Sequence, residues 1–255
     1  MKERKVISVE EFEKKGRRSF LTGLGAATVG VAGITGLNVT PDRRIPSIMR
    51  SVMDFNGDLW QALYREQALA PTFDHSEAED LIFNGRWGIL ERVNDDLVEI
   101  PLDLETYRVE VAGPGNQVLA SMTIDEIQEL PYEEMTVVHK CVEGWSQKVT
   151  WGGTRFSNFA ALFPEMMQLP VVGLETPDNV YQVSLDMDSM LHPQTLLAWE
   201  LNREPLSIRH GAPIRLTTPL KYGIKQIKRI GRVQFSEERT LDYWEERGYD
   251  WYAGL

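Results

Sequence analysis

The sequence lacks several features that define common classes of protein. It has one cysteine in 255 residues, so no disulfide can form within the chain and cysteine usage does not reveal the redox compartment. Positive charge is scarce, with 27 Lys and Arg against 38 Asp and Glu. The net charge of −11 argues against a general nucleic-acid binder, because such proteins neutralise phosphates with a surplus of cations. Internal repeats and low-complexity tracts are also missing.

The composition that remains is that of an ordinary globular protein. Hydrophobic residues make up 42% of the chain and charged residues 25%. The length suffices for one large domain or two small ones, and a domain of this size buries most of its apolar surface on folding. The composition therefore predicts a stable core but names no function.

The N-terminus has the pattern of an export signal. A polar stretch over residues 1–15 precedes the sequence RRSFLT at 17–22 and an apolar run, rich in Gly and Ala, to about Leu37. This resembles a twin-arginine signal, so we expect a signal and linker over 1–40 and the functional domain over 41–255. Two alternatives remain: a helix with two incidental arginines, and a retained membrane anchor, since the run nears the length of a membrane span and no cleavage site is clear. The twin-arginine route carries folded proteins, often with a cofactor, and leads to the periplasm.

The rest of the chain mixes short strands and short helices. Thr123 and Glu126 form a capping box that predicts a helix start, and Pro131 stops that helix. We predict strands within 97–112, with a turn at 113–116, and at 137–142, 180–186 and 214–218. Helices are predicted at 59–69, 157–163 and 236–247. Because no βαβ rhythm is present, the pattern favours an α+β fold with mixed sheets and peripheral helices.

The most informative stretch is HKCVEGWS at 139–146, which places the only thiol at a strand end before a Glu-Gly turn. A lone Cys among apolar residues is more often a core residue than a ligand. His139 and Cys141 share a strand face, which suggests zinc. Zinc needs two further ligands, however, and the other histidines are scattered singly, so we consider zinc unlikely. A cysteine nucleophile needs a base that the sequence neither shows nor excludes.

Four ordered motifs resemble a known family. They are CVEGWS at 141–146 followed by WGG at 151–153, LHPQTL at 191–196, HGAPIRL at 210–216 and KYGIKQIK at 221–228. Together they resemble the sulfite oxidase superfamily of molybdopterin enzymes, particularly its exported bacterial branch, which includes methionine-sulfoxide reductases. The resemblance covers about residues 75–235. It implies a sulfite-oxidase-type molybdopterin-binding fold.

The resemblance also implies roles for individual residues. Cys141 would be the thiolate ligand of molybdenum, which suits a soft ligand on a redox metal. Asn84 and Arg86 would lie at the catalytic pocket, with Asn84 nearest the metal, although Asn-Gly at 84–85 also reads as a surface turn. Cofactor-binding residues would be Asn84, Trp87, Thr176, His210, Arg215, Gln226, Ile227 and Lys228. His210 stands where bacterial relatives often have Asn.

Two further clusters can be interpreted without the family. Five cations fall within twelve residues, at Lys221, Lys225, Lys228, Arg229 and Arg232. A solvated strand face is the ordinary explanation of such a run, whereas Arg215 and the nearby glycines favour a phosphate cradle. The C-terminus is rich in aromatic residues, at Tyr243, Trp244, Tyr249, Trp251 and Tyr252, which we expect to serve core packing or partner docking rather than catalysis.

The implied activity is oxygen-atom transfer at a molybdenum centre that cycles between oxidation states VI and IV. In the family that the sequence resembles, sulfite oxidation relies on arginines around the metal, including one shortly after the ligand cysteine. Residues 142–146 contain no arginine, and only Arg86 and Arg155 are nearby, so the resemblance favours reduction of an S-oxide or N-oxide over sulfite oxidation. The alternatives are a sulfite dehydrogenase that passes electrons to a cytochrome c, and a non-catalytic exported binding protein. We expect no haem in this chain, a membrane cytochrome b or soluble cytochrome c as electron partner, no nucleic acid, and a monomer.

Overall fold

The computed structural model describes residues 69–254. The expected export signal at 1–40 and all but the last residue of the predicted helix at 59–69 lie outside this range. Within it, no helix is long and apolar enough to cross a membrane.

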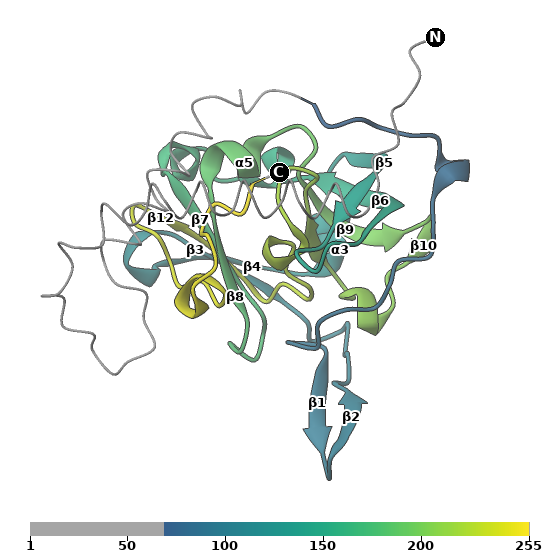
Figure 1. The fold of residues 1–255 in the computed structure, drawn as a ribbon. Helices are drawn as coiled ribbons and strands as arrows, with labels where there is room; N and C mark the ends of the chain where they lie inside the picture. The colour runs from purple at the N-terminus through teal and green to yellow at the C-terminus, as the bar shows by residue number, and fades with distance from the viewer. Residues whose placement is uncertain (1–68, 255) are drawn as a thin grey trace, which may run out of the picture. The chain divides into compact units, whose positions relative to one another are not determined.

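The first of two five-stranded sheets carries the segment with the thiol (Figure 1). All neighbouring strands in this sheet are antiparallel. The strands are β5 (Tyr132–Lys140), β6 (Ser146–Arg155), β9 (Leu196–Leu201), β10 (Glu204–Pro205) and β11 (Arg215–Thr217). The register of β6 against β9 shifts between Gly152 and Gly153. A Cβ on Gly153 would lie 2.1 Å from the Leu197 carbonyl oxygen, so this close approach requires glycine.

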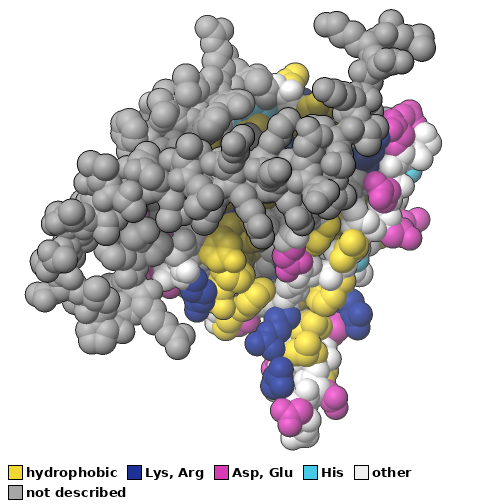
Figure 2. All heavy atoms as spheres, in the orientation of Figure 1, with side chains coloured by type: hydrophobic (Ala, Val, Ile, Leu, Met, Phe, Trp, Pro, Cys, Tyr) yellow, Lys and Arg dark blue, Asp and Glu magenta, His cyan; other side chains and the backbone are white. Residues whose placement is uncertain are grey.

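The second sheet is mixed. Its strands are β3 (Val109–Ala112), β4 (Val118–Met122), β7 (Val171–Glu175), β8 (Gln182–Asp186) and β12 (Arg232–Ser236), in the order β4-β3-β12-β7-β8. The β3–β12 pair is parallel and the other pairs are antiparallel. A separate hairpin joins β1 (Leu90–Val93) to β2 (Asp96–Glu99). Figure 2 shows hydrophobic side chains on its surface, where Val93, Leu97 and Val98 are exposed.

The helices are short. They are α3 (Ile124–Gln128), α4 (Phe156–Ala160), α5 (Met187–Leu191) and the 3₁₀ turns η1 (His75–Glu77), η2 (Pro114–Asn116), η3 (Pro164–Gln168), η4 (Ile208–His210), η5 (Gly223–Lys225) and η6 (Glu245–Arg247). The capping box at the start of α3 is confirmed, because Thr123 Oγ1 accepts from the Glu126 N–H at 3.1 Å and the Glu126 carboxylate accepts from the Thr123 N–H at 2.7 Å. The helix ends before Pro131, as predicted.

Two hydrophobic cores lie on opposite faces of the first sheet. Leu197 belongs to the larger core, which also holds the buried phenylalanines Phe156, Phe159 and Phe235. Leu196 and Ala198 belong to the smaller core around Trp151. This division follows from β9 itself, since successive side chains of a strand point to opposite faces. The sheet that leads to the thiol is therefore packed on both sides.

The observed elements confirm the predicted α+β class with mixed sheets. The strands predicted at 137–142, 180–186 and 214–218 and the helix at 157–163 are present with shifted ends. Residues 97–112 form two strands separated by a loop, and β2 is exposed at all four positions instead of half-buried. The helix predicted at 236–247 is wrong: β12 runs to Ser236 and only η6 forms. Asp242 instead binds the N–H groups of Trp244 and Glu245 in a local turn.

Candidate functional site

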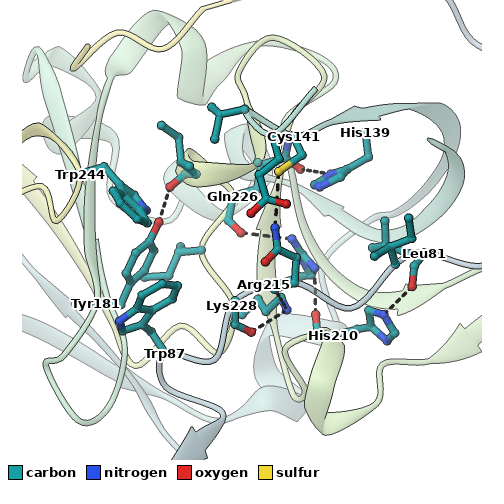
Figure 3. A pocket seen from close by; sticks show the side chains of 18 of the residues that line it. Leu81, Trp87, His139, Cys141, Tyr181, His210, Arg215, Gln226, Lys228 and Trp244 are labelled. Carbon is teal, nitrogen blue, oxygen red and sulfur yellow. Dashed lines mark hydrogen bonds between the residues drawn. The ribbon is translucent and has the colours of Figure 1, made fainter. Parts of the chain in front are cut away.

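A cavity of about 210 Å³ opens beside the end of β5 (Figure 3). It is far larger than the ~10–15 Å³ that one water molecule needs. Its walls come from four separate parts of the chain, namely 81–87, 139–145, 210–228 and 244–249, together with Tyr181. Most of the predicted site residues meet here: Asn84, Trp87, Cys141, His210, Arg215, Gln226, Ile227 and Lys228.

Cys141 is held by a tight turn directly after β5. Its N–H donates to the Trp145 carbonyl at 3.0 Å, and its own carbonyl accepts from the Gly144 N–H at 3.1 Å. The turn requires a φ of 93° at Gly144, which favours glycine. The Asn84 amide Nδ2 donates to the Cys141 sulfur at 3.5 Å, and the cysteine is 7% exposed. The thiol is therefore positioned in a cavity wall rather than packed in the core.

Arg215 places a buried positive charge in the same wall. It is 2% exposed, donates to the carbonyls of His210 and Gln226 at 3.0 and 3.1 Å, and lies over the Trp151 ring. Burial lowers the pKa of Arg215 to about 9, so the guanidinium stays charged at neutral pH. Its partners are carbonyl groups, which satisfy hydrogen bonds without neutralising the charge.

Lys228 is the second cation of the cavity. Its Nζ donates to the carbonyls of Asn84 and Arg209 at 2.6 and 2.8 Å. Burial, followed by the positive charge of Arg215, lowers the pKa of Lys228 to about 7. None of the ion pairs between residues 69 and 254 includes Arg215 or Lys228. Two adjacent cations that lack a carboxylate partner suit a bound anion such as a phosphate.

Three other cations of the basic run serve the fold, whereas the fourth, Arg232, is partly exposed on β12 and pairs with Glu110. Lys221 forms a buried ion pair with Asp186, and Lys225 forms one with Asp242. Arg229 donates to the carbonyls of Ala212 and Ile100. The solvated strand face, which we considered the ordinary explanation, is therefore wrong for these three residues. The phosphate cradle is reduced to Lys228 and Arg215.

His139 and Gln226 fix the floor of the cavity. Burial, with the nearby charge of Arg215, lowers the pKa of His139 to about 3, so the ring is neutral and its Nδ1 hydrogen bonds to Gln226 Oε1 at 3.1 Å. The Gln226 amide in turn donates to the carbonyls of Thr218 and Lys221. No group of three His, Cys, Asp or Glu residues in the described range is placed to hold a metal ion.

Two predicted residues do not line the cavity. Arg86 is exposed, and its carbonyl accepts from the N–H groups of Ile89 and Leu90 in a turn. Thr176 is buried, and its hydroxyl bonds to Asp178 and the Tyr181 backbone. Their roles in catalysis and cofactor binding remain predictions.

Sequence reasoning missed residues that line the cavity from distant segments. Trp244 and Tyr249 come from the C-terminal aromatic cluster, for which we expected core packing or partner docking. Trp244 does pack against the larger core, but it also faces the cavity. Glu143 and Trp145 lie beside the thiol and belong to the CVEGWS motif at 141–146, but no role was predicted for them. No local signal identifies Trp244 and Tyr249, because they lie about a hundred residues after Cys141.

Comparison with known proteins identifies the family of the chain. Residues 97–244 match a family model described as an oxidoreductase molybdopterin binding domain. A putative protein-methionine-sulfoxide reductase subunit of Azospira oryzae is 32% identical over 95% of this chain and 89% of its own length. The catalytic subunit of protein-methionine-sulfoxide reductase of Campylobacter jejuni is 31% identical over 59% of this chain and 57% of that protein.

A more distant relative is the mitochondrial sulfite oxidase of Rattus norvegicus, which is 28% identical over 58% of this chain and 32% of that protein. The chain thus spans about half of the Campylobacter protein and a third of the rat protein. The cavity brings together a sulfur donor and two cations that have no carboxylate partner within residues 69–254, and this set of groups fits a molybdenum–pterin–phosphate group. The chain belongs to the molybdopterin-binding oxidoreductases of the sulfite oxidase superfamily.

Proposed function

We propose that the cavity binds a molybdenum–pterin cofactor with Cys141 as the protein ligand to the metal. Arg215 and Lys228 would bind the phosphate, while His210 and the 226–228 segment would hold the pterin. The main support is that neither cation pairs with a carboxylate within residues 69–254, because a buried charge such as that of Arg215 is costly unless an opposite charge compensates it. When bound, the cofactor supplies two-electron redox chemistry and an exchangeable oxygen atom.

The chain's own residues prepare the thiol for this role. Asn84 donates a hydrogen bond to the sulfur and so helps to hold it in the cavity wall. The turn closed by Trp145 fixes the direction of the Cys141 side chain. These residues bind and orient the cofactor, and the redox step belongs to the cofactor.

We infer that the reaction is the reduction of a neutral S-oxide or N-oxide. Beside Cys141 the wall presents Val142, Trp145 and the carboxylate of Glu143, which Trp145 Nε1 holds at 3.1 Å. A carboxylate at this position repels anionic sulfite but not a neutral sulfoxide. Arg86 lies outside the cavity lining, and Arg155 is paired with Glu133 at 2.9 Å. Neither supplies the positive charge that would attract sulfite.

We also propose that the protein acts in the periplasm as a monomer and exchanges electrons with a separate partner, either a membrane cytochrome b or a soluble cytochrome c. The twin-arginine motif at 17–18 supports export. The Azospira and Campylobacter relatives are named as reductase subunits, which supports a separate partner.

The test is an assay of the metal-loaded enzyme with a reduced dye. Methionine sulfoxide, dimethyl sulfoxide and trimethylamine N-oxide are offered as acceptors, and sulfite is offered in the oxidising direction with ferricytochrome c. The proposal predicts reduction of at least one S-oxide or N-oxide and slow or no oxidation of sulfite. The variant Cys141→Ser, which keeps the size of the side chain, should fold normally and lose the activity. Turnover of sulfite alone would contradict the proposed direction, and unchanged turnover by Cys141→Ser would contradict the ligand assignment.

A further inference from the structure

The C-terminal segment Asp242–Ala253 forms part of the cavity wall, although it was absent from the predicted site. Trp244 and Tyr249 both line the cavity, and their ring centroids lie 4.9 Å apart. Trp244 also contacts the ring of Trp87, at 5.8 Å. Tyr249 is 43% exposed, which places it at the mouth. The match to the family model ends at residue 244, so Tyr249 lies beyond the family domain.

Asp242 anchors the start of this segment. Its Oδ1 accepts from the N–H groups of Trp244 and Glu245 at 3.1 Å each, which fixes the backbone of Trp244 directly. Its Oδ2 accepts from the Ser184 N–H at 3.0 Å and forms a buried ion pair with Lys225. Asp242 therefore ties the segment that carries Trp244 to β8 and to η5. Residues 226–228, which follow η5, line the cavity.

The end of the segment is anchored as well. The Tyr249 N–H donates to the Trp244 carbonyl at 3.0 Å, so the two cavity residues belong to one turn. The Tyr222 N–H donates to the Ala253 carbonyl at 3.1 Å, and Lys221 forms a β-bridge with Gly254. A segment fixed at both ends can present its rings to a ligand with little loss of conformational entropy.

The cavity has an aromatic side and a cationic side. Figure 3 shows Trp87, Tyr181 and Trp244 grouped together, while Arg215, Lys228 and His210 lie apart from them. The cationic side suits the anionic part of the cofactor. The aromatic side carries no charge of its own and suits the methyl and methylene groups of a small neutral ligand. Aromatic rings contact such groups, and sulfur, favourably.

We propose that the segment Asp242–Ala253 is the substrate-selecting wall of this cavity, in which Trp244 binds the carbon groups that flank the S=O of a slender thioether S-oxide and Tyr249 binds the stem beyond them. This inference rests on the proposed S-oxide reduction and adds the residues that choose the substrate. Tyr249, at the mouth, contacts the stem of a longer substrate such as methionine sulfoxide. Dimethyl sulfoxide has no stem and does not reach it.

The experiment compares Tyr249→Ala with Tyr249→Phe in the metal-loaded enzyme. Tyr132→Ala is the matched control, since Tyr132 is 50% exposed and does not line the cavity. Calorimetry measures the Kd of methionine sulfoxide for the oxidised enzyme without reductant, so that no turnover occurs, and the reduced-dye assay gives KM and kcat. Loss of one ring contact of ordinary strength should raise the Kd and KM about threefold to tenfold in Tyr249→Ala. Kcat should change less than about twofold.

Three further results are expected. Tyr249→Phe should restore wild-type binding, because the ring and not the hydroxyl makes the contact. Tyr132→Ala should bind methionine sulfoxide as the wild type does. The KM for dimethyl sulfoxide should stay the same in all variants. A purely structural role of Tyr249 would instead lower kcat for both substrates, and that result would overturn the proposal.

The possible failures can be distinguished. If the wild type reduces methionine sulfoxide but Tyr249→Ala binds it equally well, the selecting wall is refuted and the proposed function stands. If the wild type reduces an N-oxide but neither binds nor reduces any S-oxide, this inference is refuted and the proposed function stands. If it reduces neither an S-oxide nor an N-oxide, the proposed function is refuted, and this inference with it.

Discussion

Replacing Lys228 with Met separates the role of this cation in the fold from its role in holding the cofactor. Met keeps most of the length and apolar volume of the side chain and removes the charge. In the cofactor-free protein, the change relieves the repulsion between Lys228 and Arg215 and removes hydrogen bonds to the carbonyls of Asn84 and Arg209. These two effects oppose each other. We therefore expect the free energy of unfolding of the cofactor-free protein to change by less than about 1 kcal/mol.

Retention of the cofactor should respond much more strongly. A hydrogen bond to a charged group contributes about 1.5–3 kcal/mol, and about 1.4 kcal/mol corresponds to a tenfold change in affinity. Loss of the Lys228–phosphate contact should then weaken cofactor binding about tenfold to a hundredfold.

The lowered pKa also predicts a pH dependence. The protonated amine binds the anion, but above about pH 7 the free Lys228 is mostly neutral, so binding must take up a proton. Affinity of the wild type should fall as the pH rises above about 7, and Lys228→Met should lose this dependence.

The assay measures molybdenum per chain by elemental analysis after extensive dialysis at pH 6.5 and pH 8.5, alongside chemical denaturation of the cofactor-free protein. Lys148→Met is the control, because Lys148 lies on β6 in a surface ion pair with Glu77 and does not line the cavity. Equal molybdenum retention by the wild type and Lys228→Met at both pH values would refute the anion-binding role of Lys228. Loss of stability by several kcal/mol in the cofactor-free variant would show that Lys228 is structural instead.

Three further predictions concern the framework of the site. Lys225→Met should lower the free energy of unfolding, measured with denaturant, by about 3–5 kcal/mol, because it leaves the buried carboxylate of Asp242 without a compensating positive charge; a loss below about 1 kcal/mol would contradict this. Burial alone would raise the pKa of Asp186, but the charge of Lys221 and the hydrogen bonds from Ser189 outweigh burial, so the pKa is lowered. The stability that the Asp186 carboxylate contributes should be complete above about pH 4 and lost as the pH falls further. In this range the free energy of unfolding should therefore depend less on pH in Asp186→Asn than in the wild type. The same pH dependence in both proteins would refute the lowered pKa of Asp186. Gly211→Ala should cost about 1 kcal/mol or more in thermal unfolding and should also reduce metal retention, because φ at this glycine is 107° and a Cβ would lie 2.9 Å from the Lys228 Cβ. Gly115→Ala is the control, because φ at Gly115 is 65° but no atom lies near the added Cβ. It should lower stability through backbone strain and leave metal retention unchanged, so equal metal loss in both variants would contradict the steric argument.

Features determined by neighbours in the sequence could be predicted. The capping box of α3 joins residues three apart, and the turn that carries Cys141 is closed by a hydrogen bond to a residue four positions away. Both appear in the sequence as short patterns with a physical cause. The position of the thiol at the end of a strand followed from the same local information.

Features determined by distant partners could not be predicted. Lys221, Lys225 and Lys228 follow each other closely, yet the first two find buried carboxylates on other segments and only the third reaches the cavity. The turn η5 and the positive φ of Arg229 break the alternation that a strand face would show. The acidic pattern at 236–247 suggested a helix, but Asp242 is bound by Lys225 and by β8 instead. The positions of Trp244 and Tyr249 in the cavity wall depend on these same contacts of Asp242.

The central claim is that Cys141 holds a molybdenum–pterin cofactor in the cavity. Elemental and pterin analysis of the protein purified from its native host tests it most directly, with Cys141→Ser purified in parallel. We expect about one molybdenum and one pterin per chain in the wild type, and loss of molybdenum from the variant while its fold is kept. A folded wild-type protein without molybdenum and pterin, or a variant that retains molybdenum as the wild type does, would contradict it.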